Sequence, residues 1–170
     1  MSSMEILIQP LTKLAFAPFG EVLETSGTPT MMINQGLCGR YHDLAAVDIG
    51  EADADQGKVG ISLFDAQPRR LPYQLDMMER HPLGSQAFLP MSMTSFLVIV
   101  APDANGEPGM PLAFLSKPGQ GINFHRNIWH GVLTPLQAPG LFAVVDRIGT
   151  SKNLQEHWFE RPYIVGRTPE

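Results

Sequence analysis

Cysteine is almost absent from the sequence: Cys38 is the only one among 170 residues. A single cysteine excludes an internal disulfide and any cysteine-rich zinc site, and it suits a reducing compartment. Because no neighbouring feature would activate its thiol, we expect Cys38 to be a buried structural thiol and not a nucleophile.

Charge is also scarce. Asp, Glu, Lys and Arg make up 17% of the residues, whereas roughly 25% is usual for soluble domains. The net charge of −5 argues against nucleic acid as a partner, and an anionic substrate would need a local cluster of positive charge. A surface with so few charges is compatible with a subunit interface, and we predict a homodimer.

Long hydrophobic runs are missing. The longest covers residues 96–101, which is far too short to span a bilayer. The first residues show neither the charge nor the apolar run of a signal peptide, so we expect a cytoplasmic protein with no membrane partner. Gly-rich phosphate loops, G-x-S-x-G and Cys-x-x-Cys are also absent from the sequence.

Glycine and proline, by contrast, are plentiful, at about 18% of the chain together against a background of roughly 12%. Frequent turns and little helical periodicity predict an all-β sandwich or barrel, which we assign to one domain over residues 1–170. Helical turns are expected only at residues 11–19, where Thr12 is a possible N-cap. The expected strands are residues 6–8, 21–24, 31–34, 59–64, 71–78, 86–90, 94–101, 112–115, 121–124 and 141–148.

The most informative stretch is ERHPLGSQAFLPM, residues 79–91. Glu79 and His81 are two positions apart, so on a strand their side chains lie on the same face. Residues 82–85 are typical of a turn, and we expect Gln86 to return beside them on an adjacent strand. This combination indicates either a hydrogen-bonded network or a metal site with open positions.

Two more histidines, His125 and His130, follow in GINFHRNIWHG, residues 121–131. A single histidine in a sheet is more often structural than a ligand, but this spacing resembles the metal motif of the cupins. Glu79 and His81 stand at its two hairpin histidine positions, Gln86 at its glutamate and His130 at its last histidine. Two of the four ligands have changed type, so we predict weak binding of a divalent metal by His81, Gln86 and His130.

Five successive segments resemble the ureidoglycolate lyase family: ILIQPLTKLAFAPFGEVLE, INQGLCGRYHDLA, ERHPLGSQAFLPM, GINFHRNIWH and LFAVVDR. The resemblance covers about residues 5–165. It implies a cupin-like jelly-roll β-barrel, mostly homodimeric, that splits ureidoglycolate into glyoxylate and urea during allantoin and purine degradation. It also implies a divalent metal, nickel in particular, and no organic cofactor.

The residues suit this carbon–nitrogen lyase chemistry. Elimination requires that the hydroxyl proton be removed, the departing nitrogen be protonated and the carboxylate be held. We expect Glu79 or His130 to be the base and His81 to bind metal or act as the acid. Candidates for the carboxylate are Arg40, Lys117 and Arg147, because it favours charge-assisted donors. The other candidates for substrate binding are Tyr41, His125 and Asn127.

Three other functions remain open at this point. An amidohydrolase on the same substrate would release ammonia instead of urea. A cupin-class sugar-phosphate epimerase or isomerase is possible, although nothing obvious here binds phosphate. A cupin that binds a small carboxylic acid without turnover is the third.

Overall fold

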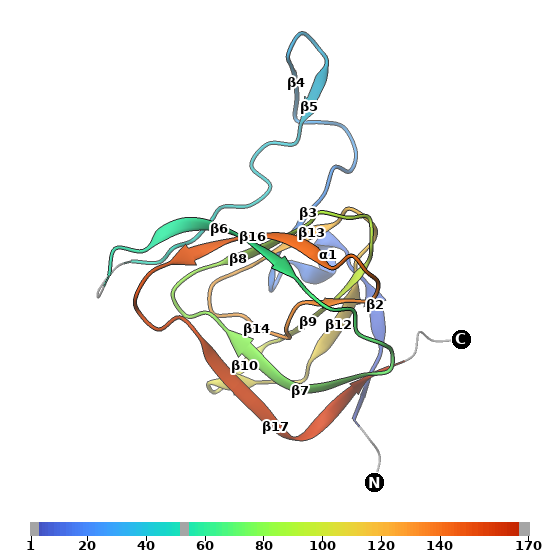
Figure 1. The fold of residues 1–170 in the computed structure, drawn as a ribbon, viewed down its shortest axis with the longest axis vertical. Helices are drawn as coiled ribbons and strands as arrows, with labels where there is room; N and C mark the ends of the chain where they lie inside the picture. Colours follow the sequence, from blue (N-terminus) through green and yellow to red (C-terminus); the bar gives the residue numbers. More distant parts are fainter. Residues whose placement is uncertain (1–3, 52–54, 167–170) are drawn as a thin grey trace.

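The computed structural model describes residues 4–51 and 55–166, which fold into two facing β-sheets (Figure 1). In the first sheet the strand order is β1-β17-β7-β14-β9-β12-β2, with β15 also paired to β9. Its strands are β1 (Glu5–Ile6), β2 (Ile8–Pro10), β7 (Tyr73–Arg80), β9 (Phe96–Ala101), β12 (Leu112–Leu115), β14 (Trp129–His130), β15 (Thr134–Pro135) and β17 (Gln155–Val165).

The second sheet has the order β3-β13-β8-β16-β6. Its strands are β3 (Gly20–Leu23), β6 (Lys58–Asp65), β8 (Gln86–Pro90), β13 (Gly121–Phe124) and β16 (Leu141–Ile148). All four neighbouring pairs in this sheet are antiparallel. The expected cupin-like all-β barrel with short helical turns is confirmed.

Strand β9 lies in the middle of the first sheet and is buried along its whole length. Its apolar residues point alternately to the two faces, as a strand requires. Phe96, Val98 and Val100 pack between the sheets, whereas Leu97 and Ile99 belong to a second apolar cluster. The prediction of a central strand buried on both faces is confirmed.

The space between the sheets is filled mainly by aromatic side chains. Phe96 and Phe142 make an edge contact with ring centroids 4.9 Å apart, and Phe88 and Phe124 make another at 6.0 Å. Helix α1 (Lys13–Phe16) adds Phe16, which is fully buried. The predicted N-cap is confirmed, since the Thr12 hydroxyl accepts a hydrogen bond from the amide of Ala15 at 3.2 Å.

The first and last described strands both belong to the first sheet. The expected strand at residues 6–8 is divided at Leu7 into β1, which pairs with β17, and β2, which pairs with β12. The C-terminal tail, which lies beyond the last strand predicted from the sequence, forms the eleven-residue β17. β17 runs antiparallel to β7, with a register shift between Trp158 and Tyr163.

The expectation that Gln86 returns on a strand adjacent to Glu79 is wrong. β7 belongs to the first sheet and β8 to the second, where β8 pairs with β13 and β16. Residues 82–85 therefore cross from one sheet to the other and do not close a hairpin. The crossing is held by Ser85, whose amide donates to the carbonyl of Asp48 at 2.8 Å.

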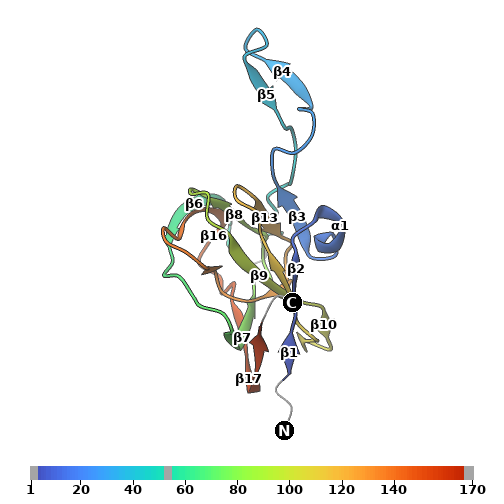
Figure 2. The same cartoon turned by 90° about the vertical axis from the view of Figure 1, so that its right-hand side faces the viewer.

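An arm projects from the two sheets (Figures 1 and 2). It consists of β4 (Met31–Ile33), β5 (Cys38–Arg40) and their turn, in which Asn34 and Gln35 have positive φ. Gly36 is the third residue of this turn with positive φ, and such residues are common in hairpin turns. Cys38 is exposed at the start of β5, so the expectation of a buried thiol is wrong. A smaller hairpin pairs β10 (Asp103–Ala104) with β11 (Glu107–Pro108). Within the described residues, no helix is long and apolar enough to cross a membrane.

Candidate active site

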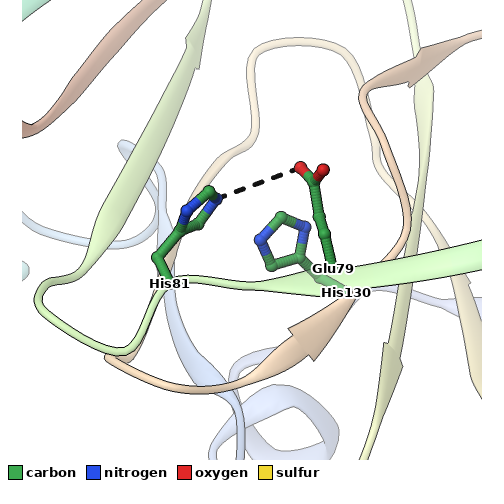
Figure 3. A group of neighbouring side chains, drawn as sticks. All are labelled: Glu79, His81 and His130. Carbon is green, nitrogen blue, oxygen red and sulfur yellow. Dashed lines mark ion pairs between the residues drawn. The ribbon is translucent and has the colours of Figure 1, made fainter. Parts of the chain in front are cut away.

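Glu79, His81 and His130 converge inside the barrel (Figure 3). Glu79 is on β7 and faces His130 of β14 directly across the ladder, and His81 follows two positions later on the same face. One possible ligand atom from each residue lies within 4.8 Å of the others. Glu79 and His81 thus share a face, as their two-residue spacing predicts, and His130 joins them, as the similarity to the cupin metal motif predicts.

The imidazole of His81 has a defined protonation pattern. Its Nδ1 lies 2.7 Å from the backbone carbonyl of Asn153. A carbonyl only accepts hydrogen bonds, so Nδ1 carries the proton and the neutral ring leaves a lone pair on Nε2. That Nε2 is buried without a hydrogen-bond partner in the described structure and lies 3.9 Å from Oε1 of Glu79.

His130 is oriented in the same way. Its Nδ1 donates to the carbonyl of Gly131 at 2.9 Å, and its Nε2 is buried without a partner among the described residues. The ring stacks on Phe124, with centroids 4.3 Å apart. Burial, assisted by the nearby His81, lowers the pKa of His130 from 6.5 to about 3. His130 is therefore neutral at physiological pH.

Glu79 has the opposite shift. Burial raises the pKa of its carboxyl group above the ordinary value. His81, when protonated, acts against this rise, and the charge of Glu156 adds to it. When Glu79 is ionised and His81 is neutral, the three groups present a carboxylate and two nitrogen lone pairs to one another, with no donor between them among the described residues. Such a set requires a cation or a shared proton, and its nitrogen and oxygen donors suit a borderline divalent metal such as nickel or zinc.

Gln86 approaches from the second sheet. It is buried, and its Nε2 donates to Oδ2 of Asp146 at 3.0 Å. This bond fixes the orientation of the amide and leaves Oε1 buried and unpartnered within the described residues. Gln86 is opposite Phe124 in the β8–β13 ladder and so shares the interior face that contacts His130. An unpaired oxygen there fits a fourth ligand.

The remaining predicted substrate-binding residues do not join this group. Arg40 is exposed on the arm, and the Tyr41 hydroxyl donates to the carbonyl of Gly27 at 3.0 Å. His125 is exposed and pairs through Nε2 with Glu21 at 2.6 Å. Of the two histidines in the GINFHRNIWHG segment, only His130 reaches the interior site.

Lys117, Asn127 and Arg147 have other surroundings. Lys117 is exposed in the turn before β13. It therefore lies near the first residue of that strand, whereas Phe124 is the last. Arg147 pairs with Asp55, and its Nε donates to the carbonyl of Ile49 at 3.0 Å. The side chain of Asn127 is exposed, but the backbone amide of Asn127 donates to the backbone carbonyl of His81 at 2.9 Å.

Two residues that support the site were not predicted from the sequence. The backbone carbonyl of Asn153 accepts a hydrogen bond from His81, and its side-chain Oδ1 accepts one from the amide of Leu83 at 2.7 Å. Asn153 therefore holds both ends of the turn after β7. No sequence signal connects the tail to His81. Phe124, which stacks on His130, lies inside the histidine-bearing segment and was overlooked because an apolar residue there resembles ordinary core.

Comparison with known proteins connects this site to one family. The family model described as ureidoglycolate lyase matches residues 3–166. The chain is 58% identical to a ureidoglycolate lyase of Rhodobacter capsulatus over 160 residues, covering 94% of this chain and 97% of the relative. A ureidoglycolate lyase of Chelativorans is 52% identical over 95% of this chain and 96% of the relative. "Ureidoglycolate lyase 2" of Rhizobium meliloti is 51% identical, with 93% and 95% covered. The chain therefore belongs to the ureidoglycolate lyase family.

Proposed function

We propose that the protein cleaves ureidoglycolate into glyoxylate and urea. The observation that carries this proposal is the convergence of Glu79, His81 and His130 on one interior point, all with acceptor atoms directed at it. The relatives named ureidoglycolate lyase support the choice of substrate. The substrate is a hemiaminal whose central carbon bears a hydroxyl, a carboxylate and the urea nitrogen.

The reaction requires one proton to leave the hydroxyl and one to reach the departing nitrogen. As the hydroxyl loses its proton, the carbonyl of glyoxylate forms and the carbon–nitrogen bond breaks, with the bonding electrons going to urea. A single carboxylate beside both atoms can accept the first proton and deliver it to the nitrogen. Glu79 suits this role because burial raises the pKa of its carboxyl group, which strengthens its conjugate base.

His130 is a poorer base, since burial keeps its pKa near 3. Its fixed Nε2 and that of His81 instead supply lone pairs that orient the reacting group. A divalent ion such as nickel would be held by these two nitrogens, with oxygens from Glu79 and Gln86. When bound, it supplies a positive charge that lowers the pKa of the substrate hydroxyl. A carboxylate has two oxygens, so holding the ion leaves Glu79 one for proton transfer.

A product assay tests this function. The purified protein is incubated with racemic ureidoglycolate, with and without chelator, and urea, ammonia and glyoxylate are measured separately. Because the substrate is labile, a sample without protein and one with the His81→Ala variant give the background. We expect urea and glyoxylate in equal amounts. Ammonia in step with glyoxylate, without urea, would make the protein a hydrolase, and glyoxylate binding without turnover would make it a binding protein.

We also infer that two copies of the chain associate through the second sheet. Its outer face exposes the apolar residues Val59, Ile61 and Leu63 of β6, of which Ile61 is 76% exposed. β6 is also the edge strand of this sheet, and a long apolar edge normally requires cover. The arm, with Met31, Met32 and Leu37 exposed, offers matching apolar surface.

Light scattering at micromolar concentration tests the association. We expect twice the monomer mass for the wild type and a shift toward the monomer for Ile61→Asp. Leu14→Asp is the matched control, because Leu14 is 88% exposed but lies on α1, which belongs neither to the second sheet nor to the arm. A monomer mass for the wild type would contradict the inference, as would equal effects of the two substitutions.

A further inference from the structure

Glu79 borders a hollow of about 340 Å³ that opens to solvent. Residues of β7 and β17 form one wall, where Glu79 and Glu156 are directly opposite each other in the ladder. Arg69, in the segment between β6 and β7, reaches the same hollow. A hollow of this size is large enough for a small organic acid.

The charges around the hollow are unequal. Asp76, Glu79 and Glu156 contribute carboxyl groups, whereas Arg69 is the one cationic residue among the described residues that line the hollow. A chain with a net charge of −5 and three acidic groups at this opening repels an anion. A carboxylate ligand therefore needs a specific cationic partner, and the lining provides one candidate.

Arg69 is placed for such a role. Its amide donates to the carbonyl of Pro135 at 2.8 Å, which anchors the backbone of this segment against the body of the protein. Its side chain is exposed, and among the described residues its guanidinium makes no ion pair or side-chain hydrogen bond, unlike Arg80, Arg126 and Arg147. Its planar donors match the two oxygens of a carboxylate.

We propose that Arg69 binds the carboxylate of the substrate and so orients its central carbon toward Glu79. The inference rests on the proposed function and assigns to Arg69 the recognition that the sequence analysis gave to Arg40, Lys117 and Arg147. The ligand class is a small 2-hydroxy or 2-oxo acid carrying one negative charge. Arg69 is then a specificity-determining residue, because it distinguishes the acid from its neutral amide.

Binding measurements test this without relying on turnover. The dissociation constant of glyoxylate is measured by calorimetry for the wild type, Arg69→Gln, Arg69→Lys and Arg70→Gln. Arg70 is the matched control, since it is the adjacent exposed arginine but does not line the hollow. We expect Arg69→Gln to weaken binding roughly 10- to 100-fold, as for a lost hydrogen bond to a charged group. The dissociation constant of Arg69→Lys should lie between those of the wild type and Arg69→Gln, and that of Arg70→Gln should lie within twofold of the wild-type value.

Glyoxylamide, the neutral analogue of glyoxylate, separates carboxylate recognition from a general loss of binding. Arg69→Gln should leave its affinity unchanged. Equal losses in Arg69→Gln and Arg70→Gln, or an equal loss of glyoxylamide binding, would overturn the assignment. The two proposals also fail separately. Arg69-dependent glyoxylate binding without urea production would contradict only the lyase function, whereas urea production by Arg69→Gln with a normal KM would contradict only the role of Arg69.

Discussion

The imidazole ring of His130 stacks on the phenyl ring of Phe124, with their planes 6° from parallel. The two side chains come from opposite sheets, so the contact joins the sheets at the candidate active site. Together with the hydrogen bond from Nδ1 to Gly131, it fixes the direction of Nε2. The protein thus holds this lone pair in place at the cost of burying a polar ring, which is expected where the ring has a chemical role.

Replacing either interior histidine should therefore abolish most activity. We expect His81→Ala and His130→Ala each to lower kcat/KM by at least about 100-fold, the lower range for a positioned catalytic group, while circular dichroism shows an intact fold. His157→Ala is the matched control, because its ring packs against Trp129 and Phe159 outside the site. Near-normal turnover by either site variant would show that the site has been placed on the wrong strands.

Local patterns in the sequence were sufficient to predict part of this arrangement. Two-residue spacing placed Glu79 and His81 on one face, and a continuous apolar run identified β9 as a buried central strand. Both inferences depend only on the alternation of side chains along a strand. The convergence of His130 with them followed from its similarity to a known metal motif and not from any local pattern.

Other features depend on contacts between distant parts of the chain. Pro82 and Gly84 indicate a turn, but whether that turn closes a hairpin or crosses to another sheet is decided by the partners of β8, which are β13 and β16. Asn153 supports His81 across 72 positions of sequence separation. The position of Arg69 at the hollow beside Glu79 likewise arises from packing that no spacing rule describes.

Acid should destabilise the protein in a pH range set by the pKa of His130 in the folded and unfolded states. In the unfolded chain an imidazole takes up its proton near pH 6.5, whereas burial holds the pKa of His130 in the folded protein near 3. Between these values the unfolded state binds the extra proton, so stability falls as pH decreases below about 6.5. The slope from this group is at most about 1.4 kcal/mol per pH unit.

Urea denaturation between pH 5 and 8, in the presence of chelator, measures this effect. The variant His130→Leu removes the titrating group from the interior, so its free energy of unfolding should vary less with pH over this range. The raised pKa of Glu79 acts in the other direction, because the folded state then retains a proton that the unfolded state releases. An unchanged slope in His130→Leu would contradict the assignment to His130.

Removing metal should slow the enzyme without unfolding it. Asn153 holds His81, and Gly131 and Phe124 hold His130, so both rings are positioned by the protein itself. We expect chelator to lower the rate of urea release while the melting temperature changes by less than about 3 °C, as for a weakly bound ligand. A large drop in melting temperature, or stoichiometric metal surviving dialysis, would contradict weak binding. Full activity in a metal-free sample would remove the metal from the mechanism.

The variant Gln86→Glu should make stability depend on metal. Gln86 donates to Asp146, so a glutamate at this position loses that hydrogen bond and places a buried carboxyl group beside the half-buried one of Asp146. Without metal, this repulsion should lower the melting temperature. With nickel, the new carboxylate adds a charged ligand on the interior face shared with Phe124, and affinity should rise about tenfold, or ~1.4 kcal/mol.

Two further variants separate these effects. Gln86→Leu removes the oxygen donor and should gain no affinity for nickel. Adding Asp146→Asn to Gln86→Glu restores a donor beside the new carboxylate. Without metal, the double variant should therefore recover the melting temperature of the wild type, while it keeps the gain in affinity for nickel. Calorimetric titration with nickel and thermal unfolding of the four proteins measure both quantities. If Gln86→Glu binds nickel no more tightly than the wild type, the oxygen of Gln86 does not face the metal, and the site consists of Glu79, His81 and His130 alone.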